Sequence, residues 1–234
     1  MRRPLIAILL LLCAGIMATV VRSNRTARPA HTSRGSLRLV VLGDSVAHGA
    51  GDEQHLGLPG WLDYELRRKG VSTTLNFGIN GARTANVARA LRESAVRQAI
   101  EKADVIVVSL GGNDLYGDSW ARLFSTVWPW YQRERTLIRV ERVVAVIQQL
   151  NPSARIYLLG LYNPYRRSNV ASWIDTQVNL WDGGLIQEFA STPGVTVVRI
   201  ADLLVRDERI SPIDHFHPGA LGYAAIARRL ADAF

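Results

Sequence analysis

The stretch VVLGDSVAHGAG, residues 40–51, places an apolar run directly before Gly43-Asp44-Ser45 and a second group of glycines. A continuous apolar run that stops at such a turn is typical of a buried strand. Ser45 then has two interpretations: it is a nucleophile presented at the end of a strand, or it is the N-cap of a helix, a position that serine favours. The tripeptide alone does not separate them, so the decision depends on the rest of the sequence.

Further apolar runs follow along the chain, and helical patterns lie between them. The predicted strands are residues 37–42, 71–77, 104–110, 154–161 and 194–200, and the predicted helices are residues 59–69, 84–101, 132–150, 173–190 and 219–233. Because the apolar runs are continuous rather than alternating, they favour parallel strands that are buried on both faces. The alternation of strands and helices predicts one α/β domain, with a five-stranded parallel sheet between two layers of helices.

The formal net charge of +8 comes mostly from the N-terminus. Six of the 28 lysine and arginine residues lie within residues 1–36, which contain no acidic residue. The rest of the chain therefore holds 22 basic and 20 acidic residues. Such a nearly neutral body lacks the basic surface that nucleic-acid binding needs, so the sequence predicts no nucleic-acid partner.

The N-terminus has the order of a secretory signal. Arg2 and Arg3 precede an almost unbroken apolar stretch over residues 5–21, and a polar, basic segment follows over residues 22–36. We interpret residues 1–21 as a signal peptide or an uncleaved N-terminal membrane anchor, and residues 22–36 as a disordered tether. The protein is therefore expected to be exported, and to be periplasmic, secreted or held at the cell surface by the apolar stretch.

Residues 37–234 form the predicted folded domain, which is long enough to bury a sizeable core. The single cysteine, Cys13, comes before this domain. We therefore expect neither a disulfide nor thiol chemistry in it. We also expect a monomer that needs no cofactor and no metal.

Four groups of chemically capable residues come after predicted strands. They are Gly43-Asp44-Ser45, Gly78-Ile79-Asn80-Gly81, Gly111-Gly112-Asn113-Asp114 and, after a short loop, Asp214-His215-Phe216-His217-Pro218-Gly219. In open α/β sheets, ligands bind beyond the carboxyl ends of the strands, all at one edge. Each group alone is readily explained as a turn or a helix cap. Because all four groups are predicted to lie at the same edge of the sheet, together they indicate an active site.

These residue types suit acyl transfer by a serine nucleophile. His217 can remove the proton of Ser45 if a carboxylate holds its second ring nitrogen, and Asp214 lies three residues earlier on the same loop. The negative charge that develops on the acyl oxygen needs hydrogen-bond donors. The candidate donors are the backbone N–H groups of Ser45 and Gly81 and the side-chain amide of Asn113. The sequence therefore predicts an acyl-enzyme on Ser45 beside an oxyanion hole.

Other residues compete for these roles. His48 and His215 are alternative bases, whereas Asp44 is expected to orient the turn rather than to react. Trp61 and the aromatic cluster at residues 120–131 are candidates for an acyl pocket or a lid, and core packing explains them equally well. The GGND and DHFH groups also permit a metal-dependent phosphoesterase, although such a site needs several carboxylate and histidine ligands around one or two ions.

Together the four groups resemble the signature of the SGNH, or GDSL-type, hydrolases. The matching positions are Ser45 in GDS, Gly81 in INGA, Asn113 in GGND and His217 in DHFH, in the family's order over about residues 38–232. Val46 stands where the family's shorter name has leucine, and it keeps the position apolar. The stretch GLYNP, residues 160–164, is similar to a bacterial lipase/acylhydrolase branch of the family.

The resemblance implies a flavodoxin-like, three-layer α/β/α fold with strand order 2-1-3-4-5, and hydrolysis of acyl esters without a metal. It assigns the family's catalytic serine, aspartate and histidine to Ser45, Asp214 and His217, and its glycine and asparagine donors to Gly81 and Asn113. The expected substrate is a small-molecule, lipid or glycan ester, with small acyl esters, thioesters, lysophospholipids and acetylated sugars as the candidate classes. Its acyl chain and leaving group depend on loop shapes that the sequence leaves open.

Overall fold

The computed structural model describes residues 37–67, 71–116 and 130–234. The predicted signal peptide or anchor at residues 1–21, the tether at residues 22–36 and most of the aromatic cluster lie outside the described residues. Within the described ranges, no helix is both long enough and apolar enough to cross a membrane.

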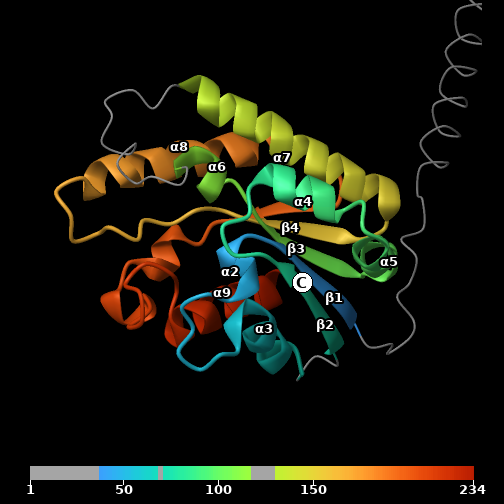
Figure 1. The fold of residues 1–234 in the computed structure, drawn as a ribbon, viewed down its shortest axis with the longest axis horizontal. Coiled ribbons are helices and arrows are strands. Elements are labelled where there is room, and N and C mark those ends of the chain that lie inside the picture. Colours follow the sequence, from blue (N-terminus) through green and yellow to red (C-terminus); the bar gives the residue numbers. More distant parts are fainter. Residues whose placement is uncertain (1–36, 68–70, 117–129) are drawn as a thin grey trace, which may run out of the picture. The chain divides into compact units, whose positions relative to one another are not determined.

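Five parallel strands form the sheet, in the order β2-β1-β3-β4-β5 (Figure 1). They are β1 (Leu37–Gly43), β2 (Val71–Gly78), β3 (Val105–Ser109), β4 (Arg155–Leu159) and β5 (Val195–Val198). Each strand begins and ends within two residues of its predicted range. The five-stranded parallel sheet and the strand order 2-1-3-4-5 are confirmed.

Helices cover both faces of this sheet, which confirms the three-layer prediction (Figure 1). On one face lie α2 (Ser45–His48), α3 (Gly57–Arg67) and α9 (Ala220–Ala233). On the other lie α4 (Thr84–Ala90), α5 (Ser94–Lys102), α6 (Gly112–Tyr116), α7 (Trp130–Leu150) and α8 (Ala171–Phe189). Two short 3-10 helices, η2 (Ala201–Leu204) and η3 (Asp207–Arg209), follow β5.

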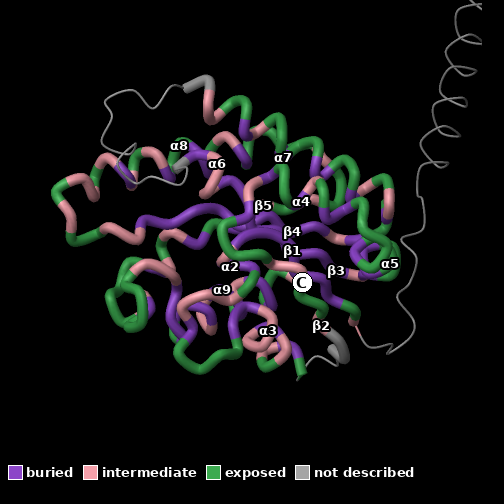
Figure 2. The backbone as a smooth tube through the Cα atoms, in the orientation of Figure 1, coloured by how far each residue is buried: buried purple, intermediate pink, exposed green. Residues whose placement is uncertain are grey.

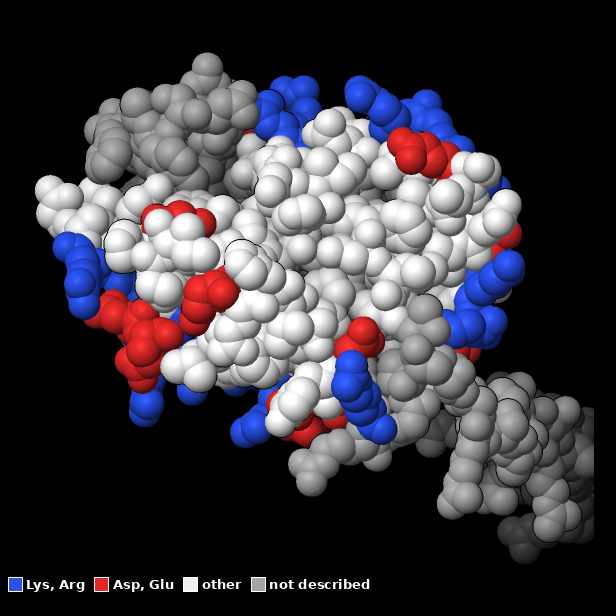
Figure 3. Space-filling view, turned by 60° about the horizontal axis from the view of Figure 1, so that its bottom comes forward, with Lys and Arg blue, Asp and Glu red and all other residues white. Residues whose placement is uncertain are grey.

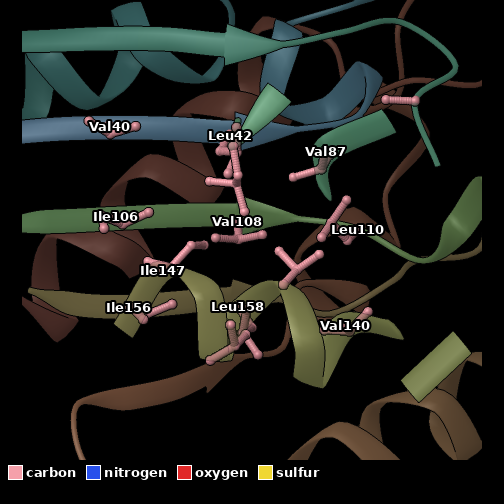
Figure 4. Packing of buried hydrophobic residues seen from close by; sticks show 14 of the residues in the cluster. Val40, Leu42, Val87, Ile106, Val108, Leu110, Val140, Ile147, Ile156 and Leu158 are labelled. Atoms are coloured by element: carbon pink, nitrogen blue, oxygen red, sulfur yellow. The ribbon is translucent and has the colours of Figure 1, made fainter. Parts of the chain in front are cut away.

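The three inner strands, β1, β3 and β4, are mostly apolar because both faces of the sheet are buried there (Figure 2). In β1, Val40 and Leu42 belong to the core under α7, whereas Leu39 and Val41 belong to the core under α3 and α9. All four side chains are at most 1% exposed. Figure 4 shows the first core, in which side chains of three neighbouring strands meet those of α7.

The prediction of one helix over residues 84–101 is wrong, because the chain forms two helices there. α4 ends at Ala90 and α5 begins at Ser94. The buried side chains explain the break: with 3.6 residues per turn, Leu91 and Val96 would lie about 140° apart around one straight helix. Both are nevertheless at most 3% exposed, in the same core. A turn between the two helices allows both of these apolar faces to point toward the sheet.

Acidic and basic side chains occur together on the described surface. On the face that Figure 3 brings forward, residues of both signs lie mostly toward the margin, and uncharged residues form the centre. Ion pairs join several of them, among these Arg229 with Asp202, Arg167 with Asp207 and Arg228 with Glu65. The absence of a nucleic-acid partner stays a prediction.

Two glycines allow the segments at the carboxyl edge of the sheet to approach each other closely. A Cβ atom on Gly43, whose φ is +142°, would lie 2.0 Å from the carbonyl oxygen of Ser109. A Cβ atom on Gly78 would lie 2.1 Å from the backbone nitrogen of His48. Because these distances are far shorter than van der Waals contact, α2 can lie against the end of β2 only while position 78 has no side chain.

We therefore expect Gly78→Ala to lower the free energy of unfolding by about 2 kcal/mol, since overpacking a close contact typically costs about 1–3 kcal/mol. Urea unfolding with linear extrapolation measures this change. Gly183→Ala is the matched control, because Gly183 is exposed in α8 and an added Cβ would meet no atom within 4 Å. This control should stabilise the protein by up to about 1 kcal/mol, since alanine is the better helix former. Equal stability of Gly78→Ala and the wild type would contradict the close packing.

Candidate active site

Ser45 is the first residue of α2, and Asp44 rather than Ser45 is the N-cap of this helix. The carboxylate oxygen Oδ1 of Asp44 accepts hydrogen bonds from the backbone N–H of Val46, at 3.1 Å, and from Oγ of Ser109, at 2.8 Å. The second bond joins the start of α2 to the end of β3. Ser45 therefore does not have to cap the helix with its side chain, and its hydroxyl is available for another partner.

Asp44 is 4% exposed, and this burial raises the pKa of its carboxyl group to about 6 because a charged carboxylate is costly away from water. Hydrogen bonds from Ser109 and from the backbone of α2 limit the rise. As a buried group that is bound on several sides, Asp44 is placed to orient the turn, as predicted for it.

The partner of Ser45 is His217, which lies 172 residues later in the chain. Nε2 of His217 is 2.9 Å from Oγ of Ser45, and Nδ1 of the same ring is 2.7 Å from Oδ2 of Asp214. The structure thus brings together the serine, the histidine and the carboxylate that the sequence predicts as a triad. The ring is held from both sides, which fixes its orientation toward the serine.

Asp214 organises the turn that carries His217. Its Oδ1 atom accepts hydrogen bonds from the backbone N–H groups of Phe216 and His217, both at 2.9 Å. Partial burial alone would raise the pKa of Asp214, but the hydrogen bonds from the ring and backbone of His217 and from Phe216 lower it overall. The group therefore stays ionised over the pH range in which a histidine of ordinary pKa titrates.

His215 takes a backbone conformation in this turn that is uncommon for a residue with a side chain, with φ at +56°. Its side chain lines a cavity of about 670 Å³, together with residues such as Glu53, Tyr165 and Arg166. Neither Ser45 nor His217 is among the described residues that line this cavity. The positive φ turns the chain between Asp214 and His217, and His215 lines this cavity, whereas His217 contacts the serine.

His48, the other alternative base, makes a different contact. Its Nδ1 atom lies 3.1 Å from the carbonyl oxygen of Gly78, at the end of β2. Among the histidines of the described residues, it is therefore His217 that reaches Ser45.

The candidate oxyanion donors lie at the start of α2, in the turn after β2 and at the start of α6, and hydrogen bonds and close packing join these segments to one another. Gly81, with φ at +73°, lies in the turn after β2, and a Cβ atom there would meet no atom within 4 Å. The N–H of Ile79 in this turn donates to the carbonyl oxygen of Gly43 at 3.0 Å. Nδ2 of Asn113 donates to the carbonyl oxygen of Ala82 at 3.0 Å, which leaves its second N–H for another acceptor.

Asp114 joins α6 to the turn after β2, a role that the sequence analysis did not predict. Its carboxylate accepts hydrogen bonds from the backbone N–H and the hydroxyl of Thr84, both at 2.8 Å, and it lies 3.5 Å from Arg139 of α7. Because Thr84 begins α4 just after Gly81, this contact ties α6, which carries Asn113, to the turn that carries Gly81. The aspartate of GGND is visible in the sequence, but its partner lies 30 residues earlier.

Asp52 is a second residue that the sequence analysis missed. It is 3% exposed and accepts hydrogen bonds from three backbone N–H groups, those of Gln54, Leu56 and Gly57. Nε1 of Trp61 donates to the same carboxylate at 3.0 Å. Trp61, a candidate for an acyl pocket, therefore serves to hold the loop between α2 and α3.

The residues of the proposed metal clusters make other contacts: Asp114 binds Thr84, and Asp214 binds His217. Over the ranges that the structure describes, no group of three or more histidine, cysteine, aspartate or glutamate side chains is arranged to hold a metal ion.

Comparisons with known proteins identify the family of this chain. The model of the GDSL-like lipase/acylhydrolase family matches residues 41–225. The uncharacterized protein YpmR of Bacillus subtilis is 28% identical to this chain, over 93% of this chain and 91% of YpmR. The spore germination lipase LipC of Bacillus licheniformis is 24% identical, over 85% of this chain and 96% of LipC.

Among solved structures, the lipase Lip_vut3 from a goat rumen metagenome has the same fold, with a TM-score of 0.73. The superposition covers 85% of this chain and 97% of the lipase, at 22% sequence identity. The match of the family model extends over most of the chain and includes all four signature groups. The chain therefore belongs to the GDSL-like lipase/acylhydrolase family, the SGNH hydrolases.

Proposed function

We propose that the protein is a serine esterase that hydrolyses carboxylic esters through an acyl-enzyme on Ser45. One observation carries this proposal: a single imidazole, that of His217, lies 2.9 Å from the serine hydroxyl and 2.7 Å from a carboxylate. This is the arrangement that activates a serine as a nucleophile.

In the first half of the reaction, Oγ of Ser45 attacks the carbonyl carbon of the ester while Nε2 of His217 takes the hydroxyl proton. Asp214 stabilises the imidazolium that forms. The bond to the leaving oxygen then breaks, and His217 returns the proton to this oxygen, which departs as an alcohol. In the second half, His217 removes a proton from water as the water oxygen attacks the acyl carbon. The bond from this carbon to Oγ of Ser45 then breaks, His217 returns the proton to Oγ, and the carboxylic acid leaves.

Three hydrogen-bond donors stabilise the negative charge on the oxygen of the tetrahedral intermediate. These are the backbone N–H groups of Ser45 and Gly81 and the free N–H of the Asn113 amide. Gly81 suits this role because nothing occupies the space beside its Cα atom, and Asn113 suits it because its amide is already oriented by Ala82. Donors that are held in place before the reaction stabilise developing charge without having to reorganise.

The proposed substrates are small-molecule, lipid or glycan esters. The relatives named as lipases support an acyl ester as the reacting group. The apolar stretch at residues 5–21 supports export, either as a cleaved signal or as an anchor that keeps the enzyme at a membrane.

A fluorophosphonate probe should label the protein covalently, and Ser45→Ala should abolish the labelling, because only an activated serine reacts with such a probe. The same variant should lower kcat/KM for p-nitrophenyl acetate by roughly 10³-fold or more. Ser94→Ala is the control, since Ser94 is an exposed residue at the start of α5. EDTA should leave the activity unchanged. Labelling that persists in Ser45→Ala, or activity that requires an added metal ion, would contradict the proposal.

Asn113→Ala should lower kcat by roughly 10²- to 10³-fold, the usual cost of losing one oxyanion donor. KM should change little, because the amide acts on charge that is present only in the transition state. Steady-state kinetics over an esterase panel from acetate to palmitate measure both constants. Asn86→Ala, which removes an exposed amide at the start of α4, is the control. A change confined to KM would argue against Asn113 as a donor.

Asp214→Asn should lower kcat by roughly 10²- to 10⁴-fold, because the amide no longer holds the His217 tautomer that accepts the serine proton. The rate of phosphonate labelling should fall by a similar factor. Asp207→Asn tests whether any exposed carboxylate of the same region has this effect, and it should leave kcat unchanged. A rate for Asp214→Asn equal to that of the wild type would remove Asp214 from the mechanism.

A further inference from the structure

The acid and the base of the proposed triad lie on one short turn, so contacts outside this turn must determine its distance from Ser45. Asp214 and His217 are three residues apart, and the hydrogen bonds between them are internal to the turn. They fix the direction of the imidazole relative to its own backbone. They do not fix the distance between His217 and Ser45, which lies on a different part of the chain. Other contacts must hold the turn against α2.

The loop between α2 and α3 lies directly against the base. A Cβ atom on Gly51 would lie 2.5 Å from Cβ of His217 and 3.0 Å from Cβ of Ser211. This loop starts at the end of α2, so its position follows that of Ser45. The backbone N–H of Ala50 in fact donates to the carbonyl oxygen of Ser45 at 2.9 Å.

Tyr223 of α9 binds this loop from the other side. Its hydroxyl donates to the carbonyl oxygen of Ala50 at 2.7 Å, and its side chain is fully buried. The backbone N–H of Tyr223 donates to the carbonyl oxygen of Gly219, two residues after His217. A short series of hydrogen bonds therefore runs from Ser45 through Ala50 and Tyr223 to the residues that follow the base.

Glu53 makes a second connection between the same two segments. Its Oε2 atom accepts a hydrogen bond from the backbone N–H of Ala220 at 3.0 Å, at the N-terminus of α9. The N-cap residue of α9, Gly219, has no side chain that could do this. A carboxylate is favourable at this position, because the N-terminus of a helix carries partial positive charge. The loop that Asp52 holds together thus supplies the cap of the helix that follows His217.

We infer that Tyr223 is a positioning residue for the proposed reaction, and that its hydroxyl bond to Ala50 sets the distance between Ser45 and His217. The inference rests on the proposed function. Tyr223 touches neither substrate nor the reacting atoms. It acts through the loop of residues 49–56, which its hydroxyl holds against the start of α9, with Glu53 as the second link.

The surroundings of Tyr223 keep its hydroxyl protonated. Burial raises the pKa of this hydroxyl, and the nearby carboxylates of Asp44, Asp52 and Asp214 raise it further. The group therefore remains a hydrogen-bond donor to Ala50 at neutral pH.

Tyr223→Phe tests the inference, because it removes the hydroxyl and keeps the ring that fills the core. We expect kcat for p-nitrophenyl acetate to fall on the order of 10-fold while KM stays within about 2-fold, since small misplacements of catalytic groups act on turnover. The rate of phosphonate labelling at Ser45 should fall by the same factor as kcat. The temperature and urea midpoints of unfolding are measured in parallel.

Tyr157→Phe is the matched control. The hydroxyl of Tyr157 donates to the carbonyl oxygen of Ala233 at 2.8 Å, so this variant loses the same kind of bond at the opposite end of α9. Its stability should fall about as much as that of Tyr223→Phe, but its kcat should remain that of the wild type. A general loosening of α9 would instead lower kcat in both variants, which would overturn the inference.

Glu53→Ala provides an independent test if Tyr223→Phe does not fold. It should lower kcat without changing KM, and Glu53→Gln, which keeps an oxygen acceptor for Ala220, should restore most of the activity. Glu65→Ala is its control. Glu65 lies in α3, and its carboxylate pairs with Arg228, which is farther along α9 than Ala220. Wild-type turnover in both Tyr223→Phe and Glu53→Ala would overturn the inference about Tyr223 but leave the proposed function standing. A wild-type protein that is neither labelled nor active would overturn the proposed function with it.

Discussion

The buried carboxylate of Asp44 joins three segments at the carboxyl end of the central strand β1. It follows β1 directly, caps α2 through Val46, and binds the hydroxyl of Ser109 at the end of β3. The absence of a side chain on Gly43 allows β1 and β3 to come close enough for this contact. Burial makes the charge of Asp44 unfavourable, as its raised pKa indicates. The position and direction of Ser45 depend on this contact.

The strand order brings the proposed oxyanion donors to the same edge of the sheet as Ser45. β1 lies between β2 and β3, with Gly43 paired to Gly78 on one side and to Ser109 on the other. The segments that carry Ser45, Gly81 and Asn113 therefore leave the sheet next to one another. His217 arrives differently, on the connection from β5 to α9, and its distance from Ser45 depends on the packing of α9 rather than on the register of the sheet.

No local pattern in the sequence predicts several of the contacts at the site. Tyr223 lies within LGYAAIA, residues 221–227, and it looks like any other core residue of an amphipathic helix. Its partner, Ala50, is 173 residues away and takes part through its backbone carbonyl oxygen, which has no sequence signature. Asp52 likewise looks like an exposed loop carboxylate until the loop closes around it. The change of phase from Leu91 to Val96 indicates the break between α4 and α5, although the helical pattern of residues 84–101 predicts one continuous helix.

By itself, the amino-acid sequence determined the five strands, the parallel sheet with helices on both faces, and the four groups of residues at its carboxyl edge, while the family signature implied the strand order. These features depend on local burial patterns and on short motifs, and both can be read along the chain. Only the tertiary structure decided that His217, rather than His48 or His215, reaches Ser45, and that Asp44 caps α2 in place of the serine. The physical reason is that the contact of His217 with Ser45 joins residues 172 positions apart, at a distance that the packing of the backbone sets. The carboxylate of Asp44 is likewise held at the start of α2 by Ser109, 65 residues away.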